Sequence, residues 1–136
     1  MGILNVTPDS FSDGGRYTDV KTAVDYALKM IDDGADIIDI GGESTRPGSL
    51  PISENKECER ILPVIESIKK INSNIILSVD TYKANVAKNA IELGADIVND
   101  ISGLTFDSNM IPLLSGKDIF VINMHINGKP KTMQKN

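Results

Sequence analysis

The sequence predicts an α/β fold made of repeated βα units, of the (β/α)8 TIM-barrel type. Short apolar runs of strand length alternate with longer segments in which apolar residues recur at helical spacing. The segment GADIIDI at 34–40 is nearly repeated as GADIVND at 94–100. The same unit, a glycine that ends a helix followed by an apolar strand, therefore occurs twice. Repeated right-handed βα units form either an open doubly wound sheet or a closed barrel.

The polar residues at the strand ends decide between these two architectures. Each predicted strand runs into polar side chains at its carboxyl end, namely Asn5, Asp39, Asp80, Asn99 and Asn123. An open sheet collects its ligand groups at one switch point, whereas a barrel gathers them from all its strands around one mouth. The pattern therefore favours the barrel. A barrel needs eight strands, so we expect residues 1–136 to be the N-terminal portion of one barrel domain, about its first five βα units without strands six to eight.

Hydrophobic periodicity gives the positions of the individual elements. The first helix has Thr18 as its expected N-cap and Gly34 as its stop. Apolar runs predict strands at 1–6, 35–40, 75–79, 95–100 and 118–125.

The remaining helices carry their own start and stop signals. The second is expected to begin near Ser53, and Pro63 within it predicts a kink or an early break. Thr81 is the expected cap of the third helix, which stops at Gly94. A weak fourth helix is predicted around residues 110–114.

Composition limits the class of protein. The net charge of −5 makes nucleic acid an unlikely partner class, so none is expected. The one cysteine, Cys58, excludes an intrachain disulfide and fits a reducing compartment. No stretch approaches the roughly 20 apolar residues that cross a bilayer, and no basic segment precedes the apolar N-terminal run. We therefore expect a cytoplasmic protein without a membrane partner.

Three strand-end side chains form the first candidate site. Asn5, Asp80 and Asn99 are expected to face one mouth of the barrel. A carboxylate accepts paired N–H groups, and an amide offers one donor and one acceptor, so this set suits a flat heterocycle with a polar edge. The alternative is that each residue only caps a turn.

The loop GGESTRPG at 41–48 is the second candidate. Its glycines let the backbone pass close to a ligand, and Ser44, Thr45 and Arg46 bring hydroxyls, N–H groups and a guanidinium together. Such a set suits a phosphate or pyrophosphate. The alternative is a surface loop in which Arg46 pairs with Glu43.

The segment TPDSFSDGG at 7–15 is the third candidate. Asp9 and Asp13 could contact a cation or polarise an amine, and Phe11 could stack on a planar ligand. The alternative is a plain connection with Phe11 folded back onto the barrel rim. His125 is the single histidine and has no cysteine partner, so a transition-metal site is not expected and a structural role is favoured.

Longer motifs carry a resemblance to a known family. MGILNVTPDSFSDGG together with DIIDIGGESTRPG resembles the dihydropteroate synthases, the folate-pathway enzymes that sulfonamides target. SVDTYKANVAKNAIELGADIVNDISG and MHINGKPKTMQ continue the resemblance in the same order, except that Ile126 stands where the family commonly has methionine. The resemblance implies a (β/α)8 barrel that joins p-aminobenzoate to a dihydropterin pyrophosphate, with Mg²⁺, and releases pyrophosphate.

The resemblance also implies roles for the first two candidate sites. Asn5 is expected to help hold the Mg²⁺–pyrophosphate, and Arg46 to bind the pyrophosphate and act in catalysis by neutralising its growing charge. Asp80 and Asn99 are expected to read the polar edge of the pterin, with Ile101 packed near it.

The p-aminobenzoate pocket is implied to form from both loops. Phe11, Asp13, Thr45 and Pro47 are its expected residues, and Thr45 also binds the pyrophosphate. Asp13 is the second expected catalytic residue, because its charge favours the cationic carbon left when pyrophosphate departs. The arylamine then attacks, positioned more than activated.

The C-terminal strands of the family have no counterpart here. They carry an Asp, a Lys and an Arg/His pair that complete the sites, so we expect this chain to be a fragment without useful activity alone. Members of the family form homodimers, but a homodimer is not assured for this fragment. Two alternatives stay open: the pterin-binding domain of a corrinoid-dependent methyltransferase, and a non-catalytic truncated barrel.

Overall fold

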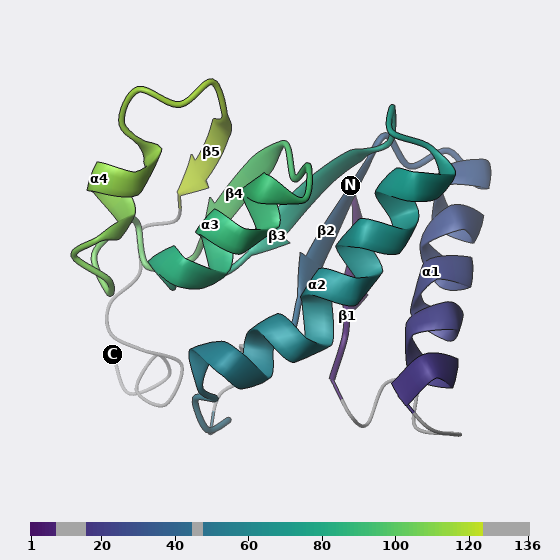
Figure 1. Ribbon diagram of the computed structural model, residues 1–136, viewed down its shortest axis with the longest axis horizontal. Coiled ribbons are helices and arrows are strands. Elements are labelled where there is room, and N and C mark those ends of the chain that lie inside the picture. Colours follow the sequence, from purple (N-terminus) through teal and green to yellow (C-terminus); the bar gives the residue numbers. More distant parts are fainter. Residues whose placement is uncertain (8–15, 45–47, 124–136) are drawn as a thin grey trace.

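The computed structural model describes residues 1–7, 16–44 and 48–123. Strands and helices alternate there in the predicted order (Figure 1). None of the described helices is long and apolar enough to cross a membrane. The elements are β1 (Gly2–Asn5), α1 (Arg16–Asp32), β2 (Ile37–Gly41), α2 (Glu54–Ile71), β3 (Ile76–Asp80), α3 (Ala84–Glu92), β4 (Ile97–Asp100), α4 (Met110–Leu114) and β5 (Phe120–Asn123).

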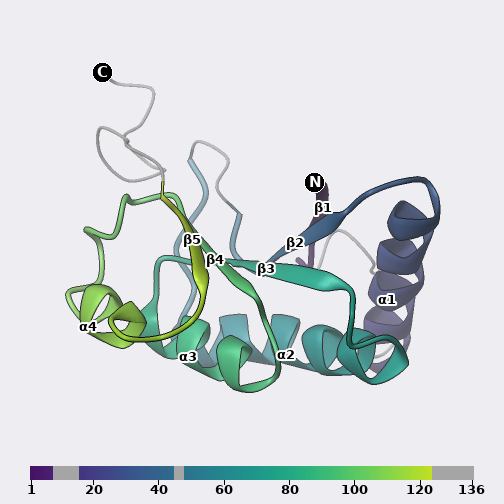
Figure 2. The ribbon, with the colours of Figure 1, turned by 90° about the horizontal axis from the view of Figure 1, so that it is seen from above.

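The five strands form one parallel sheet in the order β1-β2-β3-β4-β5. A doubly wound sheet reverses its strand order at a switch point, and the described sheet has no reversal. Helices α1, α2 and α3 lie along one side of the sheet (Figure 2). Consecutive βα units arranged in this way are those of a (β/α)8 barrel, so the predicted fold class is confirmed.

The hydrophobic core lies between the sheet and these helices. Leu4, Ile40, Val79 and Val98 are register partners on successive strands, and each is at most 1% exposed. Helix α2 meets the core with a stripe of fully buried side chains, namely Ile61, Val64, Ile65 and Ile68. Fully burying one such side chain contributes about 1.5–3 kcal/mol, so this interface dominates the packing of the described chain.

The opposite face of the sheet is open at its two edge strands, β1 and β5. Side chains alternate between faces along a strand, and Ile3 and Phe120, on this face, are 64% and 77% exposed. Near the amino ends of the strands this face has a hollow of about 480 Å³. It is lined by Ile37, Ile76, Asp96, Ile97, Phe120, Val121 and Ile122.

Several predicted helix boundaries are confirmed. Ser53 is the N-cap of α2, where its hydroxyl accepts a hydrogen bond from the Lys56 N–H at 3.1 Å. Gly34 and Gly94 follow α1 and α3 with φ of 111° and 110°. A glycine adopts this left-handed backbone without steric cost and ends the helix.

The predicted start of α1 and the predicted break in α2 are wrong. Helix α1 begins at Arg16, so Thr18 lies within it and is not the N-cap; Arg16 is a good helix former and extends the helix. Pro63 is predicted to cause a kink or an early break; helix α2 runs unbroken through it, so the break is wrong and the kink stays a prediction. Its four fully buried apolar side chains outweigh the one hydrogen bond that a proline removes.

The start of α3 is capped from a distant loop. Thr81 is not its cap, because α3 begins at Ala84 and the Thr81 hydroxyl donates to Glu57 at 2.9 Å. Instead, the carboxylate of Asp107, 23 residues further on, accepts the Ala84 N–H at 2.7 Å. The other Asp107 oxygen accepts the Asn109 N–H at 2.9 Å, which ties the loop before α4 to α3.

Replacing Asp107 by Ala tests this cap. We expect Asp107→Ala to lower the free energy of unfolding in urea by about 1 kcal/mol, because a first-turn N–H of α3 loses its acceptor. Asp107→Asn keeps a carbonyl oxygen and should lose less. The exposed Asp118→Ala is the matched control, and an equal loss in Asp118→Ala and Asp107→Ala contradicts the assignment.

Candidate functional site

Four strand-end residues form one row across the sheet. Asn5 pairs in register with Gly41, Gly41 with Asp80, and Asp80 with Asn99. The row lies one residue beyond the buried row of Leu4, so it belongs to the face turned away from the helices. The structure therefore brings the predicted residues Asn5, Asp80 and Asn99 to one edge of the sheet, as expected.

Asp39 fixes the amide of Asn99. The side-chain nitrogen of Asn99 donates to a carboxylate oxygen of Asp39 at 3.2 Å, and Asp39 is only 5% exposed. Burial raises the pKa of the Asp39 carboxyl, and the neighbouring Ser78 hydroxyl and Asn99 amide oppose that rise. In its ionised form this carboxylate only accepts hydrogen bonds, so it is the amide nitrogen of Asn99 that faces it. The amide oxygen of Asn99 and its second N–H remain to meet a ligand. Sequence reasoning placed Asp39 at a strand end but gave it no role.

Asp80 has an unusual protonation equilibrium. Burial, and after it the negative charges of Asp39, Glu57, Asp100 and Glu43, together raise the pKa of its carboxyl to about 7. Near neutral pH, Asp80 is thus close to half ionised. A ligand that donates hydrogen bonds to both of its oxygens stabilises the ionised form, which makes Asp80 suited to paired N–H groups.

Gly41 makes room for Asp80. A Cβ atom at position 41 would lie 3.3 Å from both Cβ and Oδ2 of Asp80. That separation is tighter than ordinary van der Waals contact, so a larger residue would push the carboxylate aside. The absence of a side chain at 41 is therefore part of the site.

The turn after β4 holds Ile101 beside this row. One carboxylate oxygen of Asp100 accepts the Ser102 N–H at 2.8 Å and the Ser102 hydroxyl at 2.6 Å. Ile101 lies between them and is 8% exposed. Its predicted place near the pterin fits this position, and its role stays a prediction.

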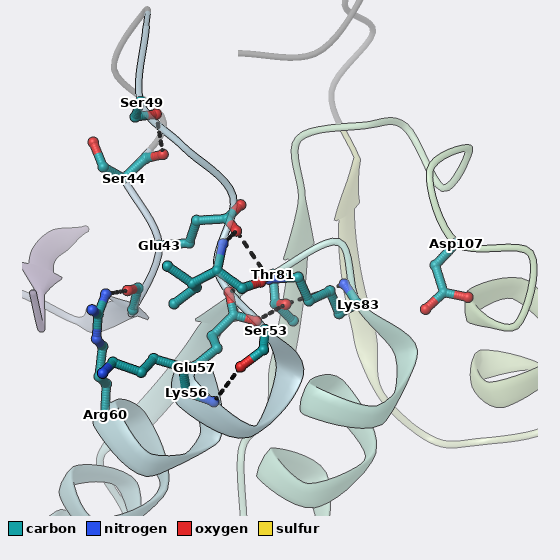
Figure 3. Close-up of polar contacts among 12 residues, drawn as sticks. Glu43, Ser44, Ser49, Ser53, Lys56, Glu57, Arg60, Thr81, Lys83 and Asp107 are labelled. Atoms are coloured by element: carbon teal, nitrogen blue, oxygen red, sulfur yellow. Dashed lines mark hydrogen bonds and ion pairs between the residues drawn. The ribbon is translucent and has the colours of Figure 1, made fainter. Parts of the chain in front are cut away.

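The two ends of the loop that follows β2 are joined by hydrogen bonds (Figure 3), and this junction of Glu43 and Ile52 is called the neck below. The Glu43 carboxylate accepts the Ile52 N–H at 2.8 Å and the Lys83 ammonium at 2.9 Å. One step further along, the Ser49 hydroxyl donates to the Ser44 carbonyl at 2.8 Å. Residues nine apart in the sequence are thus joined at the base of the predicted phosphate loop.

Two residues of α2, Glu57 and Arg60, contact residues at or beside the neck. Glu57 in the first turn of α2 is 1% exposed, accepts the Thr81 hydroxyl and lies 3.8 Å from the Lys83 ammonium. Arg60, one turn later, donates to the Gly42 carbonyl at 2.7 Å. Burial raises the pKa of the Glu57 carboxyl, and the Lys83 charge opposes that rise.

Sequence reasoning missed Lys83 and Glu57. Glu57 had a readable signal, because it stands four residues before Ile61 in the same apolar stripe of α2. A charged side chain in such a stripe is buried and needs a partner. Lys83 had no such signal, since its partner Glu43 is 40 residues away in the sequence.

The remaining predicted residues lie outside the described part of the chain. They belong to the segment 7–15, to the predicted phosphate loop at 41–48, and to the end of the fifth predicted strand. They are Asp9, Asp13, Phe11, Thr45, Arg46, Pro47 and His125.

The described residues offer Mg²⁺ few protein ligands. No group of three or more His, Cys, Asp or Glu side chains gathers as a metal site in residues 1–7, 16–44 and 48–123. Asn5, exposed at the end of β1, is the residue that would hold Mg²⁺, through its amide oxygen. One protein oxygen suits Mg²⁺, which keeps its waters and is commonly held through substrate phosphates.

A consecutive parallel βα sheet with polar side chains along its carboxyl edge is typical of TIM-barrel proteins, which bind their ligands at that edge. The chain belongs to the pterin binding enzyme family, whose model matches residues 1–136. This match covers the whole sequence, so the predicted family is confirmed.

Three relatives show how closely the chain follows individual members. It is 54% identical over 125 residues to the dihydropteroate synthase of Bacillus subtilis, covering 92% of this chain and 44% of that protein. The solved dihydropteroate synthase of Clostridium difficile with pteroic acid is 50% identical with a TM-score of 0.88, over 93% of this chain and 48% of that one. The Yersinia pestis enzyme in a sulfonamide complex is 44% identical with a TM-score of 0.88, over 100% and 49%.

The chain spans less than half the length of the Bacillus subtilis dihydropteroate synthase. Its similarity therefore concerns the part of those proteins that it matches.

The charge coupling between Asp39 and Asp80 can be tested directly. We expect Asp39→Asn to lower the pKa of Asp80 from about 7, because Asp39 is the charged neighbour with the largest effect on it. Carbon-13 NMR titration of the carboxyl groups measures this value. Asp36→Asn, at the exposed amino side of the same strand, is the control. An Asp80 pKa unchanged in Asp39→Asn would show that the coupling is absent.

Proposed function

We propose that this chain forms the N-terminal half of a dihydropteroate synthase active site. The reaction joins p-aminobenzoate to 6-hydroxymethyl-7,8-dihydropterin pyrophosphate and gives 7,8-dihydropteroate and pyrophosphate. The observation that carries the proposal is the row of Asp80 and Asn99 at the carboxyl edge of the sheet, with Asp39 holding Asn99. Membership of the pterin binding enzyme family and the similarity to dihydropteroate synthases support it.

Asp80 and Asn99 are proposed to recognise the pterin ring. The ring presents an amino group and a neighbouring N–H on one edge, which match the two oxygens of an ionised Asp80 carboxylate. The adjoining ring nitrogens meet the amide oxygen and second N–H of Asn99. Ile101 then packs against the apolar part of the ring, since it lies buried two positions after Asn99.

Arg46, Thr45 and Asn5 are proposed to bind the pyrophosphate. The neck formed by Glu43 and Ile52 keeps the two ends of the loop together. Bound Mg²⁺ would neutralise pyrophosphate charge, and Asn5 is the residue proposed to hold it. Arg46 supplies a fixed positive charge that stabilises the leaving group as the C–O bond breaks.

The second half of the reaction forms a carbon–nitrogen bond. The amine of p-aminobenzoate attacks the methylene carbon that loses pyrophosphate, and the amine then releases one proton. Phe11, Thr45 and Pro47 are proposed to hold the aryl ring, and Asp13 to favour the cationic carbon by its charge. Positioning two reactants at one site supplies much of the rate enhancement in such reactions.

The complete enzyme is proposed to need further strands. The chain covers 44% of the Bacillus subtilis protein, and the open face of its sheet exposes Ile3 and Phe120. Side chains from the rest of a barrel would cover that face and complete the pterin and pyrophosphate contacts. We also propose that the complete protein is a cytoplasmic homodimer and a sulfonamide target.

A chimeric enzyme tests this function. Residues 1–136 replace the segment of the Bacillus subtilis dihydropteroate synthase to which they are similar, and dihydropteroate formation is assayed. We expect the chimera to be active, the chimera with Asp80→Asn to lose activity by about 100-fold or more, and the 136-residue chain alone to be inactive.

Folding of each protein is checked by circular dichroism and gel filtration. A folded chimera without activity would refute the proposed function. Activity of the purified 136-residue chain alone would refute the proposed need for further strands.

A further inference from the structure

The Lys83 ammonium joins the two described ends of the loop between β2 and α2. Its Nζ donates to the Glu43 carboxylate at 2.9 Å and to the Ile52 carbonyl at 2.7 Å. Glu43 in turn accepts the Ile52 N–H. The Lys83 and Glu43 side chains are 11% and 6% exposed, so water competes little for these contacts.

The same residue is tied to the strand end that carries Asp80. The backbone N–H of Lys83 donates to the Thr81 hydroxyl at 3.1 Å. The Thr81 N–H donates to the Asn99 carbonyl at 3.1 Å, which continues the link to β4. Figure 3 shows Lys83, Thr81 and Glu43 between the loop and the helix starts. Lys83 therefore connects the loop neck to the pterin side of the site through short, buried contacts.

The charges around Lys83 balance. Glu43 and Glu57 carry two negative charges, and Lys83 and Arg60 carry two positive ones. A buried ion pair contributes little net stability compared with apolar residues of the same size. What the pair does supply is a defined geometry, because each buried charge must keep its partner.

We propose that Lys83 is a positioning residue that fixes Glu43 and Ile52, at the two ends of the loop after β2, relative to Asp80 and Asn99. The proposal rests on the proposed function, in which this loop serves the pyrophosphate and the row of Asp80 serves the pterin. It predicts that losing Lys83 affects the two parts of one substrate unequally. A residue needed only for folding would affect them equally.

Lys69 is a matched control within the same chain. Its ammonium donates to Asp96 at 2.9 Å and to the Ile75 carbonyl at 2.7 Å, and its side chain is 13% exposed. Asp96 and Ile75 precede their strands, whereas Glu43 follows its strand. Lys69 thus makes the same kind of contacts at the opposite end of the sheet.

The test compares two ligands in the chimera described above. Binding of 6-hydroxymethylpterin and of its pyrophosphate ester is measured for Lys83→Met and for Lys69→Met. We expect Lys83→Met to weaken binding of the ester by about 10- to 100-fold, as misplaced binding groups do, and to leave the unesterified pterin nearly unchanged. Lys69→Met should leave the ratio of the two affinities unchanged.

A second variant shows whether a loss in Lys83→Met comes only from leaving a buried negative charge unpaired. Glu57→Gln/Lys83→Met removes one charge of each sign and keeps an acceptor for the Thr81 hydroxyl. It should give the same selective loss as Lys83→Met. An equal loss for both ligands, no loss for either, or the same ratio change in Lys69→Met would overturn the proposal.

Hydrogen exchange separates this inference from the proposed function. In the 136-residue chain, the Ile52 amide should exchange about tenfold faster in Lys83→Met than in the unmodified chain, because its acceptor Glu43 is no longer held. Unchanged Ile52 exchange would refute the positioning role even in an active chimera. If the unmodified chimera bound neither ligand, the proposed function would fail, and the exchange result alone would decide whether Lys83 fixes the loop.

Discussion

Parallel register across β1 to β4 is the constraint on which the site depends. It places Asn5, Gly41, Asp80 and Asn99 in one row, although 94 positions separate the first from the last. Because the side-chain period of a strand is two, a slip of one residue would turn the polar row into the helix-packed core. The fully buried row that includes Ile40 excludes that slip, so the apolar core is what holds the polar edge in place.

The polar edge divides into two parts with different physical character. Around Asp80, burial and like charges disfavour ionisation, and a ligand with paired donors relieves that cost. Around Lys83, the buried charges are paired within the chain and need no ligand. The first arrangement is poised for binding, whereas the second supplies fixed geometry. Such a division is expected of a site whose binding groups rest on rigid support.

Much of the fold and part of the site could be predicted from the sequence. Apolar runs and glycine stops are local signals, so the strands, Ser53 and Gly94 were predicted correctly, and strand ends located Asp80 and Asn99. The roles of Lys83 and Asp107 depend on partners 40 and 23 residues away, which no local pattern contains. The cap predicted at Thr81 is wrong for the same reason. Its hydroxyl donates to Glu57, which belongs to another helix and cannot be recognised as its partner from the local sequence.

The most direct measurement of the central claim is the pH dependence of pterin binding. Calorimetric titration of the chimera with 6-hydroxymethylpterin measures the affinity at pH values from about 5.5 to about 7.5. This range extends from below the pKa of Asp80 to just above it. The account predicts that affinity falls as pH decreases through about 7, approaching about tenfold per pH unit, because the ionised carboxylate is the binding form. Asp80→Asn should bind weakly and without this dependence. An affinity that is constant over this range in the unmodified chimera would contradict the account.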